Sequence, residues 1–333
     1  MPDQIASARP APTPPALADA PVVAHVTRGG FVESAHRGSI AVTAPDGSVT
    51  HAWGAVDDPV LPRSSNKPIQ AVAMLRAGLQ LPPQQLALAC ASHSGQPFHL
   101  DGVRDMLAAA DLSEADLQNT PDLPYDADER ATWLAAGRAA RPLAQNCSGK
   151  HAAMLVTCRL NGWDLTTYRD PDHPLQRLMA DTLVDLAGEP VASTVVDGCG
   201  APAMAISLRG LARAVGRIAA AEPGTPEGEV AAAMRACPEF VGGTRRDVTA
   251  LIRGTEGLIA KDGAESVHVV GLADGRGIAL KIADGNQRAR PVVLAAVLRR
   301  LGVESTAYAR LEDAPTLGHG QPVGAVVAVG IEE

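Results

Sequence analysis

The chain has 333 residues, 46% of them hydrophobic and 20% charged, with a formal net charge of -8 at pH 7. A nucleic-acid-binding protein needs a basic face for the phosphates, so this acidic balance argues against that class, and no apolar run is long enough to span a bilayer. We expect a soluble, globular protein with a large core. At the N-terminus, residues 1–20 are rich in alanine and proline and lack an apolar segment, which predicts a disordered tail rather than a signal peptide.

Strand-like patterns occur near both ends of the chain. Residues 22–56 contain a turn candidate at Gly29-Gly30 and a hairpin signal at Asp46-Gly47, and two late strands, 266–271 and 277–282, flank a glycine-rich turn. A further apolar run over 323–329 can close the sheet. Apolar spacings of three and four predict helices near 68–78, 98–110, 150–161, 174–187, 202–215, 227–236 and 290–302.

This order of elements predicts an α/β (α+β) fold. Residues 21–333 are expected to form one domain, with an antiparallel sheet assembled from N-terminal and C-terminal strands and a central helical sub-domain at about 68–253. Five cysteines, an odd number spread over a large chain, are typical of free or metal-bound thiols in the cytoplasm rather than of a disulfide framework.

Lysine is scarce, and its placement indicates chemistry. The chain has four lysines against twenty-five arginines, and Lys67, Lys150 and Lys261 lie in short polar clusters. A guanidinium never gives up its proton, whereas the pKa of a partly buried ammonium can be lowered until the amine acts as a base. Codon usage would explain the scarcity but not the placement. Lys281 lies in a predicted strand outside these clusters, and we expect it to be exchangeable for arginine.

The first cluster, Arg63 to Pro68, contains Ser-x-x-Lys at the start of a predicted helix. Ser64 and Lys67 would lie one turn apart on the same face, so that the amine can take the proton of the hydroxyl. The N–H groups of the helix N-terminus could stabilise a developing oxyanion. The alternative is that the serine only caps the helix.

Four further clusters carry polar or metal-binding side chains. The segment from Ala91 to Gly95 follows an apolar run. It could place a catalytic serine hydroxyl at a cleft, or it could be an ordinary polar loop. Two cysteine segments, Asn146 to His151 and Asp197 to Gly200, could hold zinc with one more ligand and a water, or contain ordinary buried cysteines. The fifth cluster runs from Arg253 to Gly263. Its last three residues resemble the Lys-x-Gly element of penicillin-recognising enzymes, although the middle residue is Asp and no Ser-Asp-Asn element accompanies it.

Taken together and in this order, these motifs resemble the Rhizobium etli-type L-asparaginases, the asparaginase II family. The shared motifs are Arg-Ser-x-x-Lys-Pro, Cys-Ala-Ser-His-Ser, Asn-Cys-Ser-Gly-Lys-His, Pro-Asp-His-Pro-Leu-Gln, Asp-Gly-Cys-x-x-Pro and Lys-x-Gly-Ala. The likeness runs from about Thr27 to beyond Gly285 and is weakest after that. It implies a fold like that of serine β-lactamases and glutaminases, hydrolysis of L-asparagine to L-aspartate and ammonia, and a homodimer.

The resemblance also implies roles for individual residues. Ser64 with Lys67 and Ser92 with Lys261 would form two Ser–Lys pairs, and zinc would be held by Cys147, Lys150 and Cys199. That zinc is expected to support substrate binding rather than to generate the nucleophile. The substrate-binding residues are expected to be Arg63, His93, His151 and Asp197. We interpret Ser64 as the nucleophile and Lys67 as its base, with Ser92 and Lys261 relaying the proton to ammonia, and the two serines could exchange roles.

Competing interpretations remain open at this point. A glutaminase or a β-lactam-hydrolysing enzyme would use the same Ser-x-x-Lys arrangement, with a serine nucleophile and a lysine base. A zinc-stabilised binding module would need only the cysteines, and chelation would then lower its melting temperature sharply. In the simplest alternative, all the polar clusters are turns and caps.

Overall fold

A computed structural model describes residues 15–331 of the chain. Most of the disordered tail predicted for residues 1–20 lies outside this range, and a short helix, α1 (Pro15–Ala18), precedes the first strand. None of the helices in residues 15–331 combines the length and apolar character needed to cross a bilayer.

The main sheet combines strands from both ends of the chain, as predicted. Its order is β10-β11-β1-β2-β9-β8-β7, with β3 paired to β2, and every pairing is antiparallel. The strands are β1 (Val22–Arg28), β2 (Phe31–Thr43), β3 (Val49–Trp53), β7 (Ile259–Gly263), β8 (Val267–Gly271), β9 (Gly277–Ile282), β10 (Pro315–Gly318) and β11 (Gln321–Ala328). Pairing of β1 with β11 and of β2 with β9 joins the two ends of the chain.

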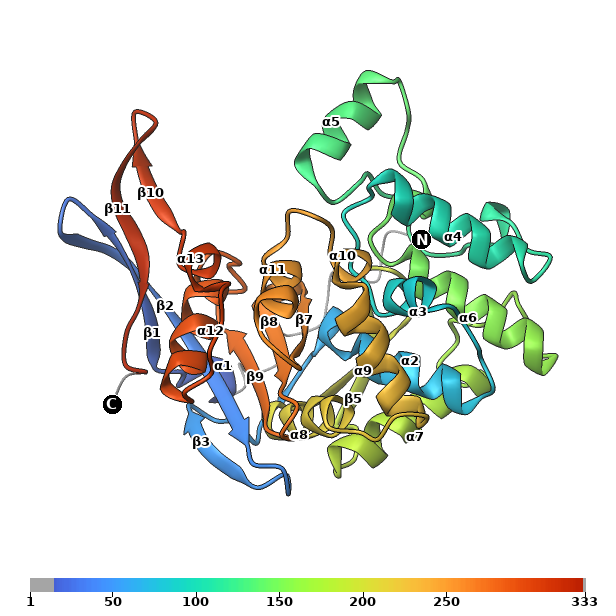
Figure 1. The fold of residues 1–333 in the computed structure, drawn as a ribbon, viewed down its shortest axis with the longest axis horizontal. Helices are drawn as coiled ribbons and strands as arrows, with labels where there is room; N and C mark the ends of the chain where they lie inside the picture. The colour runs from blue at the N-terminus through green and yellow to red at the C-terminus, as the bar shows by residue number, and fades with distance from the viewer. Residues whose placement is uncertain (1–14, 332–333) are drawn as a thin grey trace, which may run out of the picture.

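Two helices each pack against three strands of the main sheet. Helix α8 (Leu208–Ala219) packs against β2, β8 and β9, and α12 (Ala289–Arg300) packs against β1, β9 and β11. The contact with α8 is very close, because a Cβ atom at Gly277 would lie 1.8 Å from the carbonyl oxygen of Ala212. Figure 1 shows most helices from the middle of the chain gathered beside the sheet, on the side of β7.

This helical body contains most of the middle of the chain. Its helices are α2 (Lys67–Arg76), α3 (Pro83–Ala89), α4 (Pro97–Ala108), α5 (Ala127–Ala135), α6 (Ser148–Asn161), α7 (Pro174–Ala187), α9 (Pro226–Ala236), α10 (Pro238–Val241) and α11 (Asp247–Gly254). Helix α13 (Tyr308–Leu311) follows α12, and short 3₁₀ turns occur at η1 (Arg63–Asn66), η2 (Glu114–Asp116), η3 (Pro142–Ala144) and η4 (Ala264–Ser266). A sheet built from terminal strands beside a helical body is the architecture expected of the β-lactamase-like class.

One predicted helix is wrong in its first half. Residues 202–207 form strand β6 of a second, three-stranded sheet, and α8 begins only at Leu208. The other strands of that sheet are β4 (Pro59–Val60) and β5 (Ser193–Val196), in the order β4-β6-β5. All six side chains of β6 are buried, so its sequence lacks the polar–apolar alternation that would distinguish a strand from a helix.

Candidate active site

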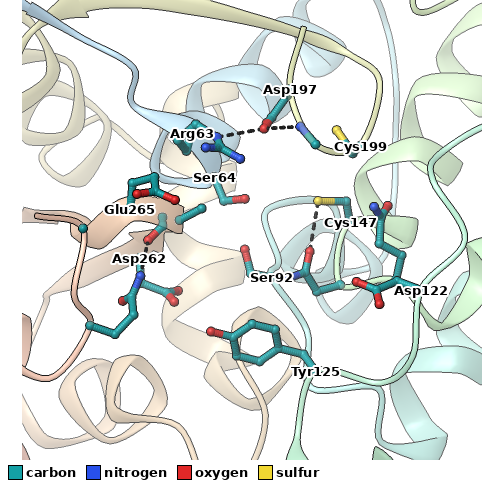
Figure 2. Close-up of a pocket in the computed structure, with 17 residues that line it drawn as sticks. Arg63, Ser64, Ser92, Asp122, Tyr125, Cys147, Asp197, Cys199, Asp262 and Glu265 are labelled. Carbon is teal, nitrogen blue, oxygen red and sulfur yellow. Dashed lines mark hydrogen bonds and ion pairs between the residues drawn. The ribbon is translucent and has the colours of Figure 1, made fainter. Parts of the chain in front are cut away.

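The polar clusters meet at one cavity of about 460 Å³ between β7 and the helical body. Its lining includes Arg63 and Ser64 from η1, Ser92 from the segment after α3, Cys147 at the start of α6, and Asp197 and Cys199 from the loop between β5 and β6. Figure 2 shows the hydroxyls of Ser64 and Ser92 pointing into the open middle of this cavity. Segments that lie far apart in the sequence therefore form a single site.

Close packing places Ser64 at the cavity wall. The backbone of Gly263, at the end of β7, lies against η1, and a Cβ atom there would be 2.8 Å from the Pro62 carbonyl oxygen and 3.1 Å from the Ser65 nitrogen. Only glycine fits this approach without a shift of the backbone. The Ser64 side chain remains partly exposed towards the cavity.

Ser92 is hydrogen-bonded to two buried lysines. Its Oγ accepts a hydrogen bond of 2.9 Å from Lys261 Nζ and one of 3.2 Å from Lys67 Nζ. Lys67 also donates to the carbonyl oxygen of Ala91. The expected contact of Ser92 with Lys261 is present, whereas among the described residues no hydrogen bond joins Lys67 to Ser64. In this structure the amine of the Ser-x-x-Lys motif contacts the second serine.

The electrostatic environment of Lys261 favours partial loss of its proton. The side chain is fully buried on β7, and this burial lowers the pKa of Lys261 to about 8. The carboxylate of Asp262, with Oδ1 2.8 Å from the Lys261 Nζ, acts in the opposite direction. The nearby charge of Lys67 lowers the pKa further. A neutral amine is therefore accessible near neutral pH, as a proton acceptor requires.

Asp262 is itself held by two arginines that sequence analysis did not identify. Its Oδ2 accepts hydrogen bonds from Arg246, just before α11, and from Arg290 in α12, the latter at 3.3 Å. Burial alone would raise the pKa of the Asp262 carboxyl, but the charges of Arg246, Lys261 and Arg290 hold it well below its usual value. The carboxylate thus stays charged beside the Lys261 amine.

Two sulfur atoms and an amine converge at the opposite wall of the cavity. The Lys150 Nζ lies 3.3 Å from Cys199 Sγ, and a hydrogen bond with Cys199 lowers the pKa of the Cys147 thiol well below its usual value. Asp197 adjoins them and accepts a hydrogen bond of 2.8 Å from Arg63 Nε. Within residues 15–331, no three His, Cys, Asp or Glu side chains cluster in a way suited to a metal ion, so Lys150 would have to be a ligand. The two cysteines are common zinc ligands as thiolates, whereas the Lys150 amine could join them only after losing its proton.

The structure does not bring His93 and His151 to the cavity, contrary to the expectation that they bind substrate. Both rings are fully buried, and neither lines the cavity. His93 Nε2 is 2.8 Å from Ser148 Oγ, and His151 Nδ1 is 2.7 Å from the Tyr168 hydroxyl. Burial lowers the pKa of both imidazoles well below the ordinary value. They are neutral core residues that pack around the start of α6.

Two residues were missed or misjudged by sequence analysis. Glu265, directly after the Lys-x-Gly-Ala motif, lines the cavity, and this position was the only signal that could have identified it. Lys281, expected to be exchangeable for arginine, is 8% exposed and donates hydrogen bonds to the carbonyl oxygens of Glu265 and Ile282, the second at 2.8 Å. Because the amine is buried and holds a residue of the cavity wall, the larger guanidinium would disturb it.

The comparison with protein families agrees with the motifs. The model of the L-asparaginase II family matches residues 24–328. Among solved structures, the chain is similar to Mglu in its native form, with 15% identity and a TM-score of 0.42 over 85% of this chain and 66% of that chain. It is also similar to the structure of a Bacillus glutaminase determined in the presence of 4.3 M NaCl. The identity is 13% and the TM-score 0.45, over 80% of this chain and 91% of that one. No curated protein sequence matches the chain.

The chain thus spans slightly under two thirds of the native Mglu structures, 66% of one and 63% of another. The family match, by contrast, covers residues 24–328 and includes every motif that meets at the cavity. The chain belongs to the L-asparaginase II family.

Proposed function

We propose that the protein is an amidohydrolase that converts L-asparagine to L-aspartate and ammonia through a serine ester. The observation that carries this proposal is the Ser92 hydroxyl, hydrogen-bonded to the buried amines of Lys67 and Lys261 at a cavity that Ser64 also lines. Amide hydrolysis requires a nucleophile, a base that accepts its proton and a donor that protonates the leaving nitrogen. Two serines and two lysines supply these groups.

In the proposed reaction, Ser64 Oγ attacks the carbonyl carbon of the substrate amide while Lys67 accepts the hydroxyl proton. Collapse of the tetrahedral intermediate breaks the C–N bond, and the proton reaches the leaving nitrogen through Ser92 and Lys261. Ammonia departs and leaves an aspartyl ester on Ser64. Water then attacks this ester while one of the lysines accepts a proton from it. The bond between the acyl carbon and Ser64 Oγ breaks, the proton passes to Ser64 Oγ, and L-aspartate is released.

The hydrogen bonds also support an exchange of roles, because Ser92 contacts both amines directly. The two assignments can be separated by mass spectrometry. We expect a reactive asparagine analogue to add its mass to the peptide that contains Ser64, and the Ser64→Ala variant to lose this adduct. An adduct on Ser92 that survives in Ser64→Ala would assign the nucleophile to Ser92. The absence of any adduct and of any turnover would contradict serine catalysis.

We further propose that Cys147, Lys150 and Cys199 bind a zinc ion that supports substrate binding. When bound, zinc supplies a Lewis-acidic centre that can coordinate a substrate carboxylate. Asp197, adjacent to this site and paired with Arg63, orients the groups around it. Chelation is then expected to weaken asparagine binding while the melting temperature changes little. A sharp fall in melting temperature would instead support the binding-module interpretation.

Location and assembly are also proposals. All five cysteines are free thiols, which supports a reducing cytoplasm. For assembly, we propose a homodimer that forms through the β1–β2 and β10–β11 hairpins, which project from the body in Figure 1. These hairpins expose apolar side chains, including Phe31, which is 73% exposed, and Leu317, which is 54% exposed. Apolar groups concentrated on projecting hairpins favour association.

A further inference from the structure

The backbone is strained at two residues of the cavity wall. In residues 15–331, the non-glycine residues with left-handed φ angles are Arg63 (51°), Asp111 (55°), Glu265 (57°), Ser266 (57°) and His319 (50°). Asp111 and His319 lie in exposed turns, whereas Arg63 and Glu265 line the cavity and Ser266 follows directly. Left-handed conformations are unfavourable for such residues, and they persist where the surrounding structure imposes them, often at binding sites.

Buried contacts impose the conformation of Glu265. The Lys281 amine, on β9, donates to the Glu265 carbonyl oxygen and is fixed by a second hydrogen bond of 2.8 Å to the Ile282 carbonyl oxygen. The Glu265 carboxylate lies over Gly285, where a Cβ atom would be 2.3 Å from Glu265 Oε2. Ser266 is fully buried, and its hydroxyl has no hydrogen-bond partner. The structure therefore holds the Glu265 side chain at the cavity at the expense of local strain and an unsatisfied hydroxyl.

The Glu265 carboxylate forms no salt bridge within the described part of the chain, although Lys281 lies near enough for their charges to interact. The other acids on this side of the cavity are paired, Asp197 with Arg63 and Asp262 with Lys261. Asp122 also lines the cavity without an ion pair among residues 15–331, but Figure 2 shows it on the opposite side from Glu265. Of these two unpaired acids, only Glu265 is held by strained backbone.

We propose that Glu265 binds the α-ammonium group of the amino-acid substrate and that Lys281 is the positioning residue that fixes it. This inference rests on the proposed hydrolysis of L-asparagine. Figure 2 shows Glu265 on the same wall as Arg63 and Ser64. A substrate that carries an ammonium and a carboxylate on one carbon can contact Glu265 and Arg63 together, while its amide carbon, two bonds away, reaches the serine hydroxyls. The site would then select α-amino acids over simple carboxylates.

Calorimetric titration of L-aspartate and succinate tests this role without requiring turnover, because the two ligands differ only in the α-ammonium group. The wild-type protein is expected to bind L-aspartate roughly 10- to 100-fold more tightly than succinate, the range for one charge-assisted contact. Glu265→Gln should abolish this preference. Asp122→Asn, the matched control on the opposite wall, should retain it. A Glu265→Gln variant that keeps the preference, or an Asp122→Asn variant that loses it, would overturn the inference.

Lys281→Met tests the positioning role, since it keeps the buried stem but removes both hydrogen bonds. It should reduce the preference for L-aspartate while leaving the succinate affinity within about threefold of the wild type. Equal losses for both ligands would indicate a merely structural role, and if this variant does not fold, Glu265→Gln still decides the site. A Glu265-dependent preference in a protein that releases no ammonia from asparagine would uphold the binding site and refute the proposed function.

Discussion

Replacement of Asp262 by asparagine should move the pH dependence of catalysis. Asp262 Oδ1 lies 2.8 Å from Lys261 Nζ, and its negative charge opposes the burial that lowers the pKa of Lys261 to about 8. An amide of the same shape keeps a hydrogen-bond acceptor at this position and removes the charge. The neutral Lys261 amine exists above its pKa, so kcat/KM should rise with pH through about 8 in the wild-type protein.

Loss of the charge lowers the pKa of Lys261, so the rise should occur at a lower pH in Asp262→Asn. An opposite charge at such a distance shifts a pKa by about 1–3 units. We therefore expect the acid limb of the profile, the pH range over which kcat/KM rises, to move by about this amount. The change also removes one of the carboxylates that pair with Arg246 and Arg290 and should destabilise the fold by about 3–5 kcal/mol. The measurement is therefore made at a temperature where circular dichroism shows the variant to be folded.

A matched control separates the local charge from general damage to this network. Asp247 pairs with Arg290 but does not contact Lys261, so Asp247→Asn should destabilise the fold while the acid limb moves much less. Ionisation of free asparagine affects all three profiles equally. An unchanged limb in Asp262→Asn, or an equal shift in Asp247→Asn, would refute the role of Lys261 as a proton acceptor tuned by Asp262.

Three further changes test other parts of the account. Lys67→Arg should lower turnover by about 10²–10⁴-fold, because a guanidinium cannot accept a proton. The larger side chain in this buried position should also lower the free energy of unfolding, measured by thermal melting, by about 1–3 kcal/mol. An active variant would refute Lys67 as a base. Elemental analysis should find about one zinc ion per chain, most of it lost in Cys199→Ser, and unchanged metal content would refute that ligand. Phe31→Glu should shift the mass measured by sedimentation from that of a dimer to that of a monomer. The control Leu160→Glu, at a residue of α6 that is 58% exposed, should leave the dimer intact. A dimer that persists in Phe31→Glu would refute the hairpin interface.

The motifs predicted which segments meet at the site better than they predicted individual contacts. Turn signals such as Gly29-Gly30 and Asp46-Gly47 are local, so the strands beside them could be identified from sequence. The pairing of Lys67 with Ser92 could not, because it depends on how the segment after α3 packs against α2. Helical spacing alone favoured Ser64, which is one turn from Lys67 in the sequence.

Burial explains the remaining differences. His93 and His151 lie within motifs, but a motif does not show whether a side chain faces the cavity or the core, and both face the core. Lys281 lies outside every motif, yet its amine reaches across from β9 to the Glu265 carbonyl oxygen. Such contacts between distant elements leave no pattern of spacing in a single sequence.

Ammonia release from L-asparagine and L-glutamine by the purified protein tests the central claim most directly. The account predicts that kcat/KM for asparagine exceeds that for glutamine by about 10–200-fold, the range for one methylene group in a fitted site. Equal or reversed values would contradict the asparagine preference. No ammonia from either substrate would contradict the amidohydrolase itself.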